Sequence, residues 1–463
     1  MRRDPPPAAA YLASRIRLGM KFGLETMQAL VAALGHPERA FASLLVAGTN
    51  GKGSVVAYAD SVLRASGLRV GRYTSPHLVH VGERIAVGGR AISDRALDRE
   101  VARVRAAAEA LAADGSLPAQ PTFFEVLTAA ALLHFQRARV EVAVLEVGMG
   151  ARLDATNVAD PLCSAIVTID RDHEAHLGTT LAAIAREKAG VLRRGRVTVL
   201  GPMADEARAA IVDAADRIGA RIADTTSDRV VPRAGGKVDV VTPRRVHRDL
   251  LPLAGAHQLA NVAVAVRLLE EARAAGIAVD LSKMAAGIAG TRWPGRLQRL
   301  PGRPPLLVDG AHNPAAAQAL ADELRRQGRF VLVFAAMVDK DIAAMGRILF
   351  PLAQEVILTK VSSDRAAAPN VIARLVGAPA RGAKTAATVR AALARARRLA
   401  GPRGLVVAAG SLYLAGEVLR SVAAGRRGRS PRKYPRASGV SHSAGPTKVR
   451  RRVPSPPMRK VSG

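Results

Sequence analysis

The stretch that decides the fold is Leu44-Leu45-Val46-Ala47-Gly48-Thr49-Asn50-Gly51-Lys52-Gly53-Ser54. An apolar run ends in three glycines, a lysine and a serine, and an Ala-rich helical pattern then continues to Ala65. We expect a strand, a glycine-rich turn and a helix, in which backbone N–H groups, the positive helix end and the Lys52 ammonium attract phosphate. The general pattern has Ser or Thr directly after the lysine, whereas Gly53 intervenes here, and an ordinary glycine-rich turn is the alternative.

The composition fits a globular protein with two domains. A chain of 463 residues exceeds one ordinary core, and 49% of its residues are hydrophobic. The single cysteine, Cys163, excludes a disulfide within the chain and fits a reducing compartment. We read no apolar signal-peptide region after the charged N-terminus and no apolar span long enough for a membrane helix, so we expect a cytoplasmic location.

The formal net charge of +31 makes nucleic-acid binding an alternative function. Twelve basic residues lie from Arg426 onward, however, and no acidic residue follows Glu417. This C-terminal segment is rich in Ser, Pro and Gly, so we expect residues 426–463 to form a disordered basic tail. Aromatic side chains for base stacking make up only 3% of the chain. We therefore expect no specific nucleic-acid partner.

Two successive patterns of alternating strands and helices predict an α/β fold. The first has expected strands at 44–47, 68–73, 140–147 and 165–169 and expected helices at 54–65, 96–113, 122–137, 182–189 and 257–274. The second has expected strands at 306–308, 330–335, 355–358 and 405–408 and expected helices at 315–326, 383–399 and 411–422. We predict a mostly parallel sheet domain with the phosphate loop over residues 1–290 and a smaller Rossmann-like domain over residues 291–425. Between 201 and 253 the pattern is mixed, with short strands near 237–241.

Polar side chains lie at or just after the ends of several expected strands. They are Ser75, Glu146, Asp172, His173, Asp309 and His312. Ligands of open α/β sheets bind beyond the carboxyl ends of the strands, and magnesium prefers oxygen ligands, so we predict a magnesium–nucleotide site between the two domains. Any one of these residues taken alone is equally well explained by a cap or an ion pair. Taken alone, His173 is typical of a structural histidine and Lys188 of a cation at a helix C-terminus.

Several motifs, in this order along the chain, resemble those of the folylpolyglutamate synthase family, whose members are ATP-dependent ligases related to the Mur ligases. The motifs are Gly48–Ser54, Ser75–Leu78, Glu146–Gly150, Leu153–Asn157, His173 with Leu177-Gly178, Glu187–Gly190, His257-Gln258 with Asn261, Gly295-Arg296 and Asp309–Pro314. The resemblance covers residues 11–422 and leaves the basic tail outside it.

The resemblance implies ATP and Mg²⁺ as cofactors and a role for each matching residue. ATP would be bound by Asn50, Gly51, Lys52, Gly53, Ser54, Asn261, Arg296 and Asp309. The metal would be held by Ser75, Glu146 and His173. The catalytic residues would be Lys52, Lys188 and His312, with Lys188 carbamylated, which replaces the helix-terminus interpretation of that lysine. The pterin-bearing substrate would be bound by Met20, Lys21, Phe22, Thr122, Phe123, Phe124, Glu125, Leu153, Asp154 and Ala155.

Within this family the run Arg152-Leu153-Asp154-Ala155 resembles the bifunctional bacterial type. The resemblance then implies a monomeric ligase that adds L-glutamate to dihydropteroate and to folates such as tetrahydrofolate, through an acyl phosphate. Ala151 departs from the family, which has a second glycine there, and bears on the shape of the pterin loop. The alternatives are a Mur-type amino-acid ligase of cell-wall synthesis and a nucleic-acid-binding P-loop protein.

Overall fold

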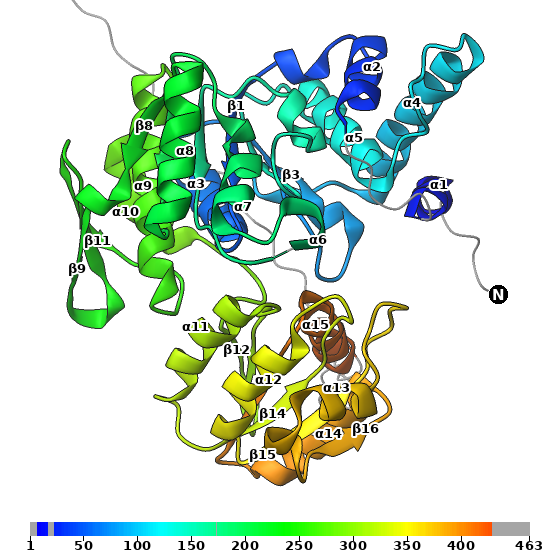
Figure 1. Ribbon diagram of the computed structural model, residues 1–463, viewed down its shortest axis with the longest axis vertical. Coiled ribbons are helices and arrows are strands. Elements are labelled where there is room, and N and C mark those ends of the chain that lie inside the picture. The colour runs from blue at the N-terminus through cyan, green and yellow to red at the C-terminus, as the bar shows by residue number, and fades with distance from the viewer. Residues whose placement is uncertain (1–6, 17–22, 173, 428–463) are drawn as a thin grey trace, which may run out of the picture. The chain divides into compact units, whose positions relative to one another are not determined.

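Three β-sheets with helices packed against them make up the described part of the chain (Figure 1). The computed structural model describes residues 7–16, 23–172 and 174–427. The predicted substrate residues Met20, Lys21 and Phe22, the predicted metal ligand His173 and residues 428–463 of the predicted tail lie outside these ranges. Within them, no helix combines the length and the apolar character needed to cross a bilayer.

The largest sheet has eight strands in the order β4-β3-β2-β5-β1-β6-β7-β8. Their bounds are β1 Ala42–Ala47, β2 Val70–Tyr73, β3 Ile85–Val87, β4 Arg90–Ala91, β5 Val142–Glu146, β6 Cys163–Ile166, β7 Val197–Leu200 and β8 Arg221–Asp224. All neighbouring strands are parallel except the pairs β2–β3 and β3–β4, which are antiparallel. The predicted mostly parallel sheet is therefore confirmed.

Helices cover both faces of this sheet, which explains why β1 is apolar along its whole length. Leu45 and Ala47 point into one core, and Leu44 and Val46 point into the opposite core. The first core is built with α2 Glu25–Ala33, α4 Asp94–Ala113, α5 Phe123–Arg137, α7 Leu181–Lys188 and α8 Asp205–Ile218, and also takes in α1 Pro7–Ile16. The second is built with α3 Lys52–Ala65, α9 His257–Ala274 and α10 Met284–Gly290. The central position of β1 brings the phosphate loop to the middle of the sheet edge.

The region between 201 and 253 holds more structure than its sequence pattern indicated. It contains α8 and a three-stranded antiparallel sheet in the order β11-β10-β9, with β9 Arg229–Pro232, β10 Val238–Val241 and β11 Val246–Leu250. Helix α8 was missed because four of its five buried residues are alanines, which give only a weak apolar periodicity.

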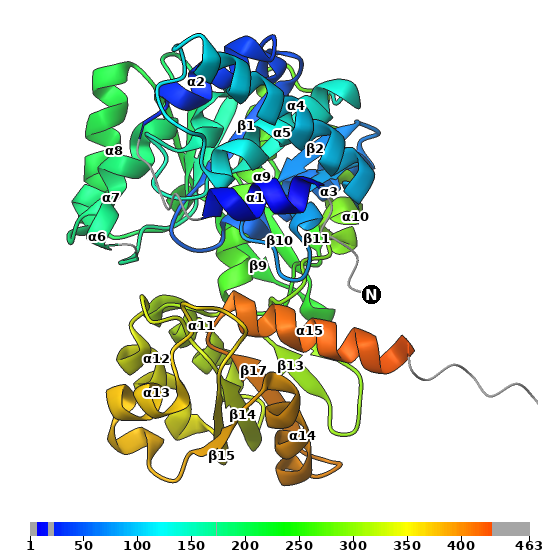
Figure 2. The same cartoon turned by 90° about the vertical axis from the view of Figure 1, so that its right-hand side faces the viewer.

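The second large sheet has six strands in the order β12-β13-β17-β14-β15-β16, and residues 291–427, which carry it, are called the six-stranded region below. The strands are β12 Gln298–Leu300, β13 Leu306–Val308, β14 Phe330–Phe334, β15 Glu355–Thr359, β16 Lys384–Ala386 and β17 Leu405–Ala409. Helices α11 Pro314–Leu324, α12 Ile342–Leu349 and α13 Pro369–Val376 pack on one face, and α14 Val389–Ala400 and α15 Leu412–Arg427 on the other (Figure 2). Only the β12–β13 pair is antiparallel.

Three details of the six-stranded region correct the sequence-based prediction. The helix expected from Ala383 begins only at Val389, because Lys384–Ala386 pairs with β15 as an edge strand and Thr388 then caps the helix. The first strand of the region is β12, which precedes the expected one. Helix α15 extends to Arg427, so the first two residues of the predicted tail belong to it.

Candidate active site

The phosphate loop joins the end of β1 to the start of α3, as the sequence predicted. Gly48 and Gly51 have φ angles of 141° and 82°, which side-chain-bearing residues rarely adopt. A Cβ atom on Gly51 would also clash with the Asn261 side chain. Glycine is therefore required at Gly51 for two separate reasons, and the turn that it permits lines the cavity.

Hydrogen bonds from the segment that follows β6 fix the conformation of the phosphate loop. Thr49 N donates to Thr168 O over 2.8 Å, and Asn50 N donates to Thr168 Oγ1 over 3.0 Å. Asp170 N donates to Thr49 Oγ1 over 3.0 Å, and Asn50 Nδ2 donates to Asp170 Oδ2 over 3.2 Å. Neither Thr168 nor Asp170 was predicted as a site residue, although Thr168 lies near the end of the strand predicted at 165–169 and Asp170 directly follows it.

Two lysines, the buried Lys188 and the partly buried Lys52, meet at one carbonyl of the loop. Lys52 Nζ donates to Gly48 O at 2.9 Å and to Thr49 O at 3.1 Å, and Lys188 Nζ donates to Gly48 O at 3.0 Å. Burial and the nearby Lys52 charge lower the pKa of Lys188 to about 7, and burial also lowers the pKa of Lys52. The Lys188 amine thus reaches the phosphate loop instead of capping its own helix, and near neutral pH a large fraction of it is uncharged.

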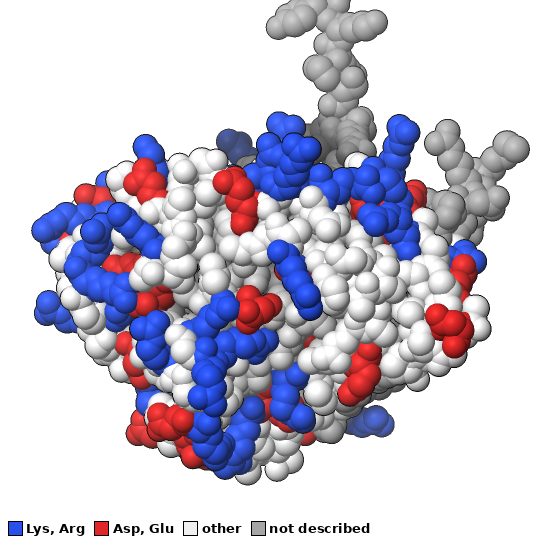
Figure 3. All heavy atoms as spheres, turned by 90° about the horizontal axis from the view of Figure 1, so that it is seen from above, with Lys and Arg blue, Asp and Glu red and all other residues white. Residues whose placement is uncertain are grey.

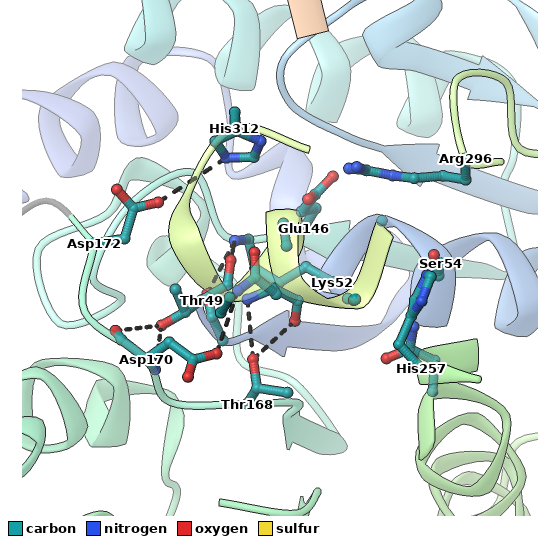
Figure 4. Close-up of a pocket in the computed structure, with 18 of the residues that line it drawn as sticks. Thr49, Lys52, Ser54, Glu146, Thr168, Asp170, Asp172, His257, Arg296 and His312 are labelled. Atoms are coloured by element: carbon teal, nitrogen blue, oxygen red, sulfur yellow. Dashed lines mark hydrogen bonds and ion pairs between the residues drawn. The ribbon is translucent and has the colours of Figure 1, made fainter. Parts of the chain in front are cut away.

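Glu146 and Ser75 lie together at the ends of β5 and β2. Ser75 N donates to Glu146 Oε2 over 3.0 Å, and Figure 4 shows Arg296 directed toward Glu146. Burial raises the pKa of Glu146, and the Lys52 ammonium acts against that rise. Two of the three predicted metal ligands are thus adjacent. In the described ranges no group of three or more His, Cys, Asp or Glu side chains has an arrangement that could hold a metal ion.

The six-stranded region reaches this site through the loops after β13 and β14. Asn313 Nδ2 donates to Asn50 Oδ1 over 2.9 Å, and the Lys340 ammonium lies 2.7 Å from Asp172 Oδ1. Both partners of the Lys340–Asp172 ion pair are about 10% exposed. The sequence analysis missed Lys340, because nothing in its local sequence indicates a partner in the other sheet.

His312 is held as a neutral imidazole. Its Nδ1 lies 2.9 Å from Gly310 O, and since a carbonyl can only accept, Nδ1 carries the proton. Burial lowers the pKa of His312 to about 4. Nε2 therefore keeps its lone pair, at 4.0 Å from Asp172 Oδ2, and is available as an acceptor.

Two predicted ATP-binding residues make their hydrogen bonds inside the protein. Asp309 accepts the N–H groups of Leu297 and Ala311, each at 2.8 Å, so its carboxylate shapes the loop next to Arg296. Asn261 Nδ2 donates to Gln258 Oε1 over 3.1 Å. Both side chains nevertheless line the cavity.

The structure gathers the described members of the predicted nucleotide and metal set around one cavity of about 320 Å³. They are Asn50, Gly51, Lys52, Gly53, Ser54, Ser75, Glu146, Lys188, Asn261, Arg296, Asp309 and His312. The cavity also receives Asp170 and Asp172 from behind the loop and His257 from α9 (Figure 4).

A second, larger cavity of about 1340 Å³ adjoins the first and shares Ser75, Gly148 and His312 with it. Its lining includes the predicted substrate residues Thr122, Phe123, Phe124, Glu125, Leu153, Asp154 and Ala155.

Three polar side chains in the wall of this larger cavity make hydrogen bonds to residues close to them in the sequence. They are Thr122, Glu125 and Asp154. Thr122 and Glu125 cap α5 reciprocally, with Thr122 N donating to Glu125 Oε2 over 2.7 Å. Asp154 Oδ2 accepts the N–H groups of Gly148 and Met149, both at 3.0 Å, and thereby fixes the loop after β5. Ala151 in this loop is fully buried in the core, so its extra methyl group is accommodated.

Comparison with known proteins finds the same families along nearly the whole described chain. Residues 46–269 match the Mur ligase middle domain, and residues 295–412 match the Mur ligase glutamate ligase domain. The chain is 38% identical over 423 residues to a probable bifunctional folylpolyglutamate synthase/dihydropteroate synthase of Halobacterium salinarum, covering 89% of this chain. It spans about half of that relative's length, namely 51%.

Two further proteins match over most of their own length. A dihydrofolate synthase/folylpolyglutamate synthase of Bacillus subtilis is 34% identical, with 78% of this chain and 86% of the relative aligned. A solved structure of Mycobacterium tuberculosis folylpolyglutamate synthase complexed with ADP is 32% identical and superposes with a TM-score of 0.82, covering 92% of this chain and 100% of that chain.

Proposed function

The chain belongs to the dihydrofolate synthase/folylpolyglutamate synthase family of Mur ligases, and from this premise we propose that it is an ATP-dependent ligase. It adds L-glutamate to dihydropteroate and to folates such as tetrahydrofolate, through an acyl phosphate. One observation carries the proposal: a cavity with a phosphate loop, two lysines and a buried carboxylate opens beside a larger cavity lined by aromatic side chains.

The residues present fit a nucleotide with a divalent metal. The φ angle of 82° at Gly51 allows a sharp turn between β1 and α3, and this turn lines the cavity. The first N–H groups of α3 point out of the helix start and favour an anion there. Burial raises the pKa of Glu146, and a cation beside Ser75 and Glu146 would favour the charged carboxylate.

We assign the following roles to the chain's own groups. Bound ATP with Mg²⁺ supplies a transferable phosphoryl group, which converts a carboxylate that has a poor leaving group into a reactive one. Lys52 adds positive charge at the loop, and Arg296 reaches in from the segment before β12. Ser75 and Glu146, together with His173, would hold the metal. The contacts of Asn313 and Lys340 with the loop side hold the two sheets around the reacting groups and limit the access of water.

Lys188 is proposed to carry a carbamate. A neutral amine attacks the carbon of CO₂, forms an N–C bond and releases one proton to water, which leaves a carboxylate on the side chain. The lowered pKa of Lys188, about 7, supplies the neutral amine that this step needs. The product would place a negative charge beside the Lys52 ammonium and remove the repulsion that Lys52 exerts on a protonated Lys188.

The second substrate is proposed to occupy the larger cavity. Phe123 and Phe124 offer apolar faces for a pterin ring, and the loop ordered by Asp154 closes the wall next to them. His312, neutral with Nε2 as an acceptor, lies where the two cavities meet and is suited to orient the incoming glutamate amine. We further propose that the protein is a cytoplasmic monomer with a domain boundary near residue 290.

The nucleic-acid alternative finds little support on the face of the protein that Figure 3 shows. On the face in Figure 3, Lys and Arg side chains are interspersed with Asp and Glu instead of forming one continuous field. A continuous basic stripe is what phosphate-backbone binding requires.

The test measures ADP release that depends on L-glutamate, with dihydropteroate and, separately, with tetrahydrofolate as the acceptor. We expect turnover with both, and mass spectrometry of the products should show one added glutamate residue. Turnover with neither acceptor would contradict the proposed function, and turnover with tetrahydrofolate alone would restrict it to polyglutamylation.

A further inference from the structure

Trp293 lies in the segment 291–296 that joins α10 to β12, and it is the only tryptophan of the chain. We propose that Trp293 is a positioning residue that ties this segment to the phosphate loop and so sets how Arg296 enters the nucleotide cavity. The proposal deepens the proposed function and rests on it, because it assumes that the cavity binds a nucleotide.

The indole ring lies directly against the start of α3. A Cβ atom built on Gly53 would lie 2.8 Å from Trp293 Cζ2 and 3.0 Å from Trp293 Nε1. These separations are shorter than side chains tolerate, so the ring occupies the space that any side chain at position 53 would take. Trp293 therefore contacts the bare backbone of a residue that belongs to the predicted phosphate site.

The side chain of Arg72 in β2 packs on the Trp293 ring. The Arg72 guanidinium lies 5.3 Å from the centroid of the Trp293 ring, in the range of a cation–π interaction. Arg72 Nη1 also donates to Asp60 Oδ2 over 3.3 Å, and Asp60 is fully buried on α3. The ring is thus fixed by a strand that ends near the nucleotide cavity and by a helix that begins at it.

The chain is hydrogen-bonded to α3 before Trp293 and to the six-stranded region within two residues after it. Before it, Ser61 Oγ of α3 donates to Gly287 O over 2.7 Å, which ties α10 to α3. After it, Gly310 N donates to Gly295 O over 2.8 Å, which ties the segment to the six-stranded region. Trp293 packs on Gly53 at the start of α3, and Arg296 lines the cavity three residues later.

The first experiment uses the tryptophan as its own reporter. We expect the intrinsic fluorescence of the full-length protein to change in a saturable way on titration with ADP, because the ring touches the loop that binds it. We expect Trp293→Ala to raise the KM for ATP about tenfold with a smaller change in kcat and unchanged KM values for glutamate and dihydropteroate. Trp293→Phe, which keeps an aromatic ring over Gly53, should restore most of the affinity.

Arg292→Ala is the matched control. Arg292 belongs to the same segment, its side chain is exposed, and its Nη1 donates to backbone carbonyls of Ala289 and Thr291. This variant should leave the KM for ATP within about twofold of the wild type. An equal rise for Arg292→Ala and Trp293→Ala would contradict a specific role for the ring.

The second experiment tests the contact itself. Gly53→Ala should raise the KM for ATP about tenfold, because the new methyl group meets the indole. In the double variant Gly53→Ala/Trp293→Ala the two rises in the KM for ATP should combine to less than their product, since the smaller side chain at position 293 makes room for the new methyl group. A full product of the two effects would mean that the methyl group meets the nucleotide and not the ring, and would overturn the proposal.

Calorimetric titration with ADP separates the two levels of inference. If the wild-type protein binds no ADP, the proposed function is contradicted, and the role of Trp293 falls with it. If ADP binds but the fluorescence stays constant and Trp293→Ala keeps the wild-type KM for ATP, only the role of Trp293 is contradicted.

Discussion

The two adjoining cavities are built in different ways. The smaller one, about 320 Å³, is formed by a glycine-rich turn whose backbone is fixed by Thr168 and Asp170 and by buried charges around it. The larger one, about 1340 Å³, is formed by side chains from several loops, with Phe123 and Phe124 as its aromatic surface. Backbone geometry thus specifies the first cavity, and side-chain choice specifies the second.

This difference predicts how each cavity responds to mutation. In the larger cavity Thr122, Glu125 and Asp154 form hydrogen bonds with residues close to them in the sequence. They act mainly by shaping the wall, so affinity for the second substrate should depend on apolar contact. In the smaller cavity the charged groups face one another, so single changes there should remove activity while leaving the larger cavity intact.

The largest expected effect is that of Lys52→Met. The ammonium lies between the carbonyls of Gly48 and Thr49 and is the nearest full positive charge to the turn. Its loss should lower glutamate-dependent ADP release by about 10³-fold or more, with dihydropteroate binding unchanged. Stopped assays of ADP and equilibrium dialysis of dihydropteroate measure the two quantities. Undiminished turnover of Lys52→Met would contradict a role for the phosphate loop in phosphoryl transfer.

Lys188 gives the next largest effect and a pH dependence with a defined sign. Lys188→Ala should lower kcat about 10²-fold, and Lys188→Arg should do so equally, because a guanidinium stays protonated and cannot react with CO₂. In the wild type the pKa of about 7 means that the amine gains a proton as pH falls through neutrality. Activity should therefore fall on the acid side of pH 7 and rise toward a plateau on the alkaline side.

A depletion experiment isolates the carbamate from other effects of pH. Wild-type protein held in CO₂-free buffer at constant pH should lose activity and regain it when bicarbonate is added. Lys188→Arg serves as the control and should not respond to bicarbonate. If the activity of the wild type did not depend on CO₂, the carbamate would be contradicted, and Lys188 would act as an unmodified amine or ammonium group.

Phe124→Ala tests the larger cavity on its own. The Phe124 ring lies 5.8 Å from that of Tyr73 and packs over Gly148, so its removal opens the apolar wall. We expect the KM for dihydropteroate to rise about tenfold while the KM for ATP stays constant. Phe41→Ala, which removes a ring packed on Phe135 away from both cavities, controls for general loss of stability. A matching rise in the KM for ATP would mean that the two cavities are not independent.

The same contrast explains how much the sequence could predict. The phosphate loop, Glu146 and Ser75 were predictable because glycine spacing and strand ends are local features, and parallel strands bring their carboxyl ends to one edge. Thr168 and Lys340 were not, because their partners lie more than 100 residues away and neither has a local pattern. The edge strand at Lys384–Ala386 was missed for a related reason, since its only sheet partner is β15.

The smallest expected effect concerns the contact between the two sheets. Lys340 and Asp172 form an ion pair that is about 10% exposed, and Asn313 also donates toward Asp172 at 3.4 Å. Lys340→Met keeps the length of the side chain but leaves the carboxylate with one fewer partner, so closing the two sheets around substrate should become less favourable. We expect the KM values for ATP and for the second substrate to rise together, each about fivefold, because both cavities are completed by this contact.

Lys384→Met is the matched control for that variant, because Lys384 pairs with Glu355 at 2.7 Å on the far edge of the same sheet, where both groups are about 30% exposed. Exposed pairs contribute little, so this variant should match the wild type in both KM values. Raising the salt concentration should narrow the difference in KM values between Lys340→Met and the wild type only slightly, since the pair is only about 10% exposed. A rise confined to the KM for ATP would instead place Lys340 at the nucleotide alone, and the two cavities would then close independently.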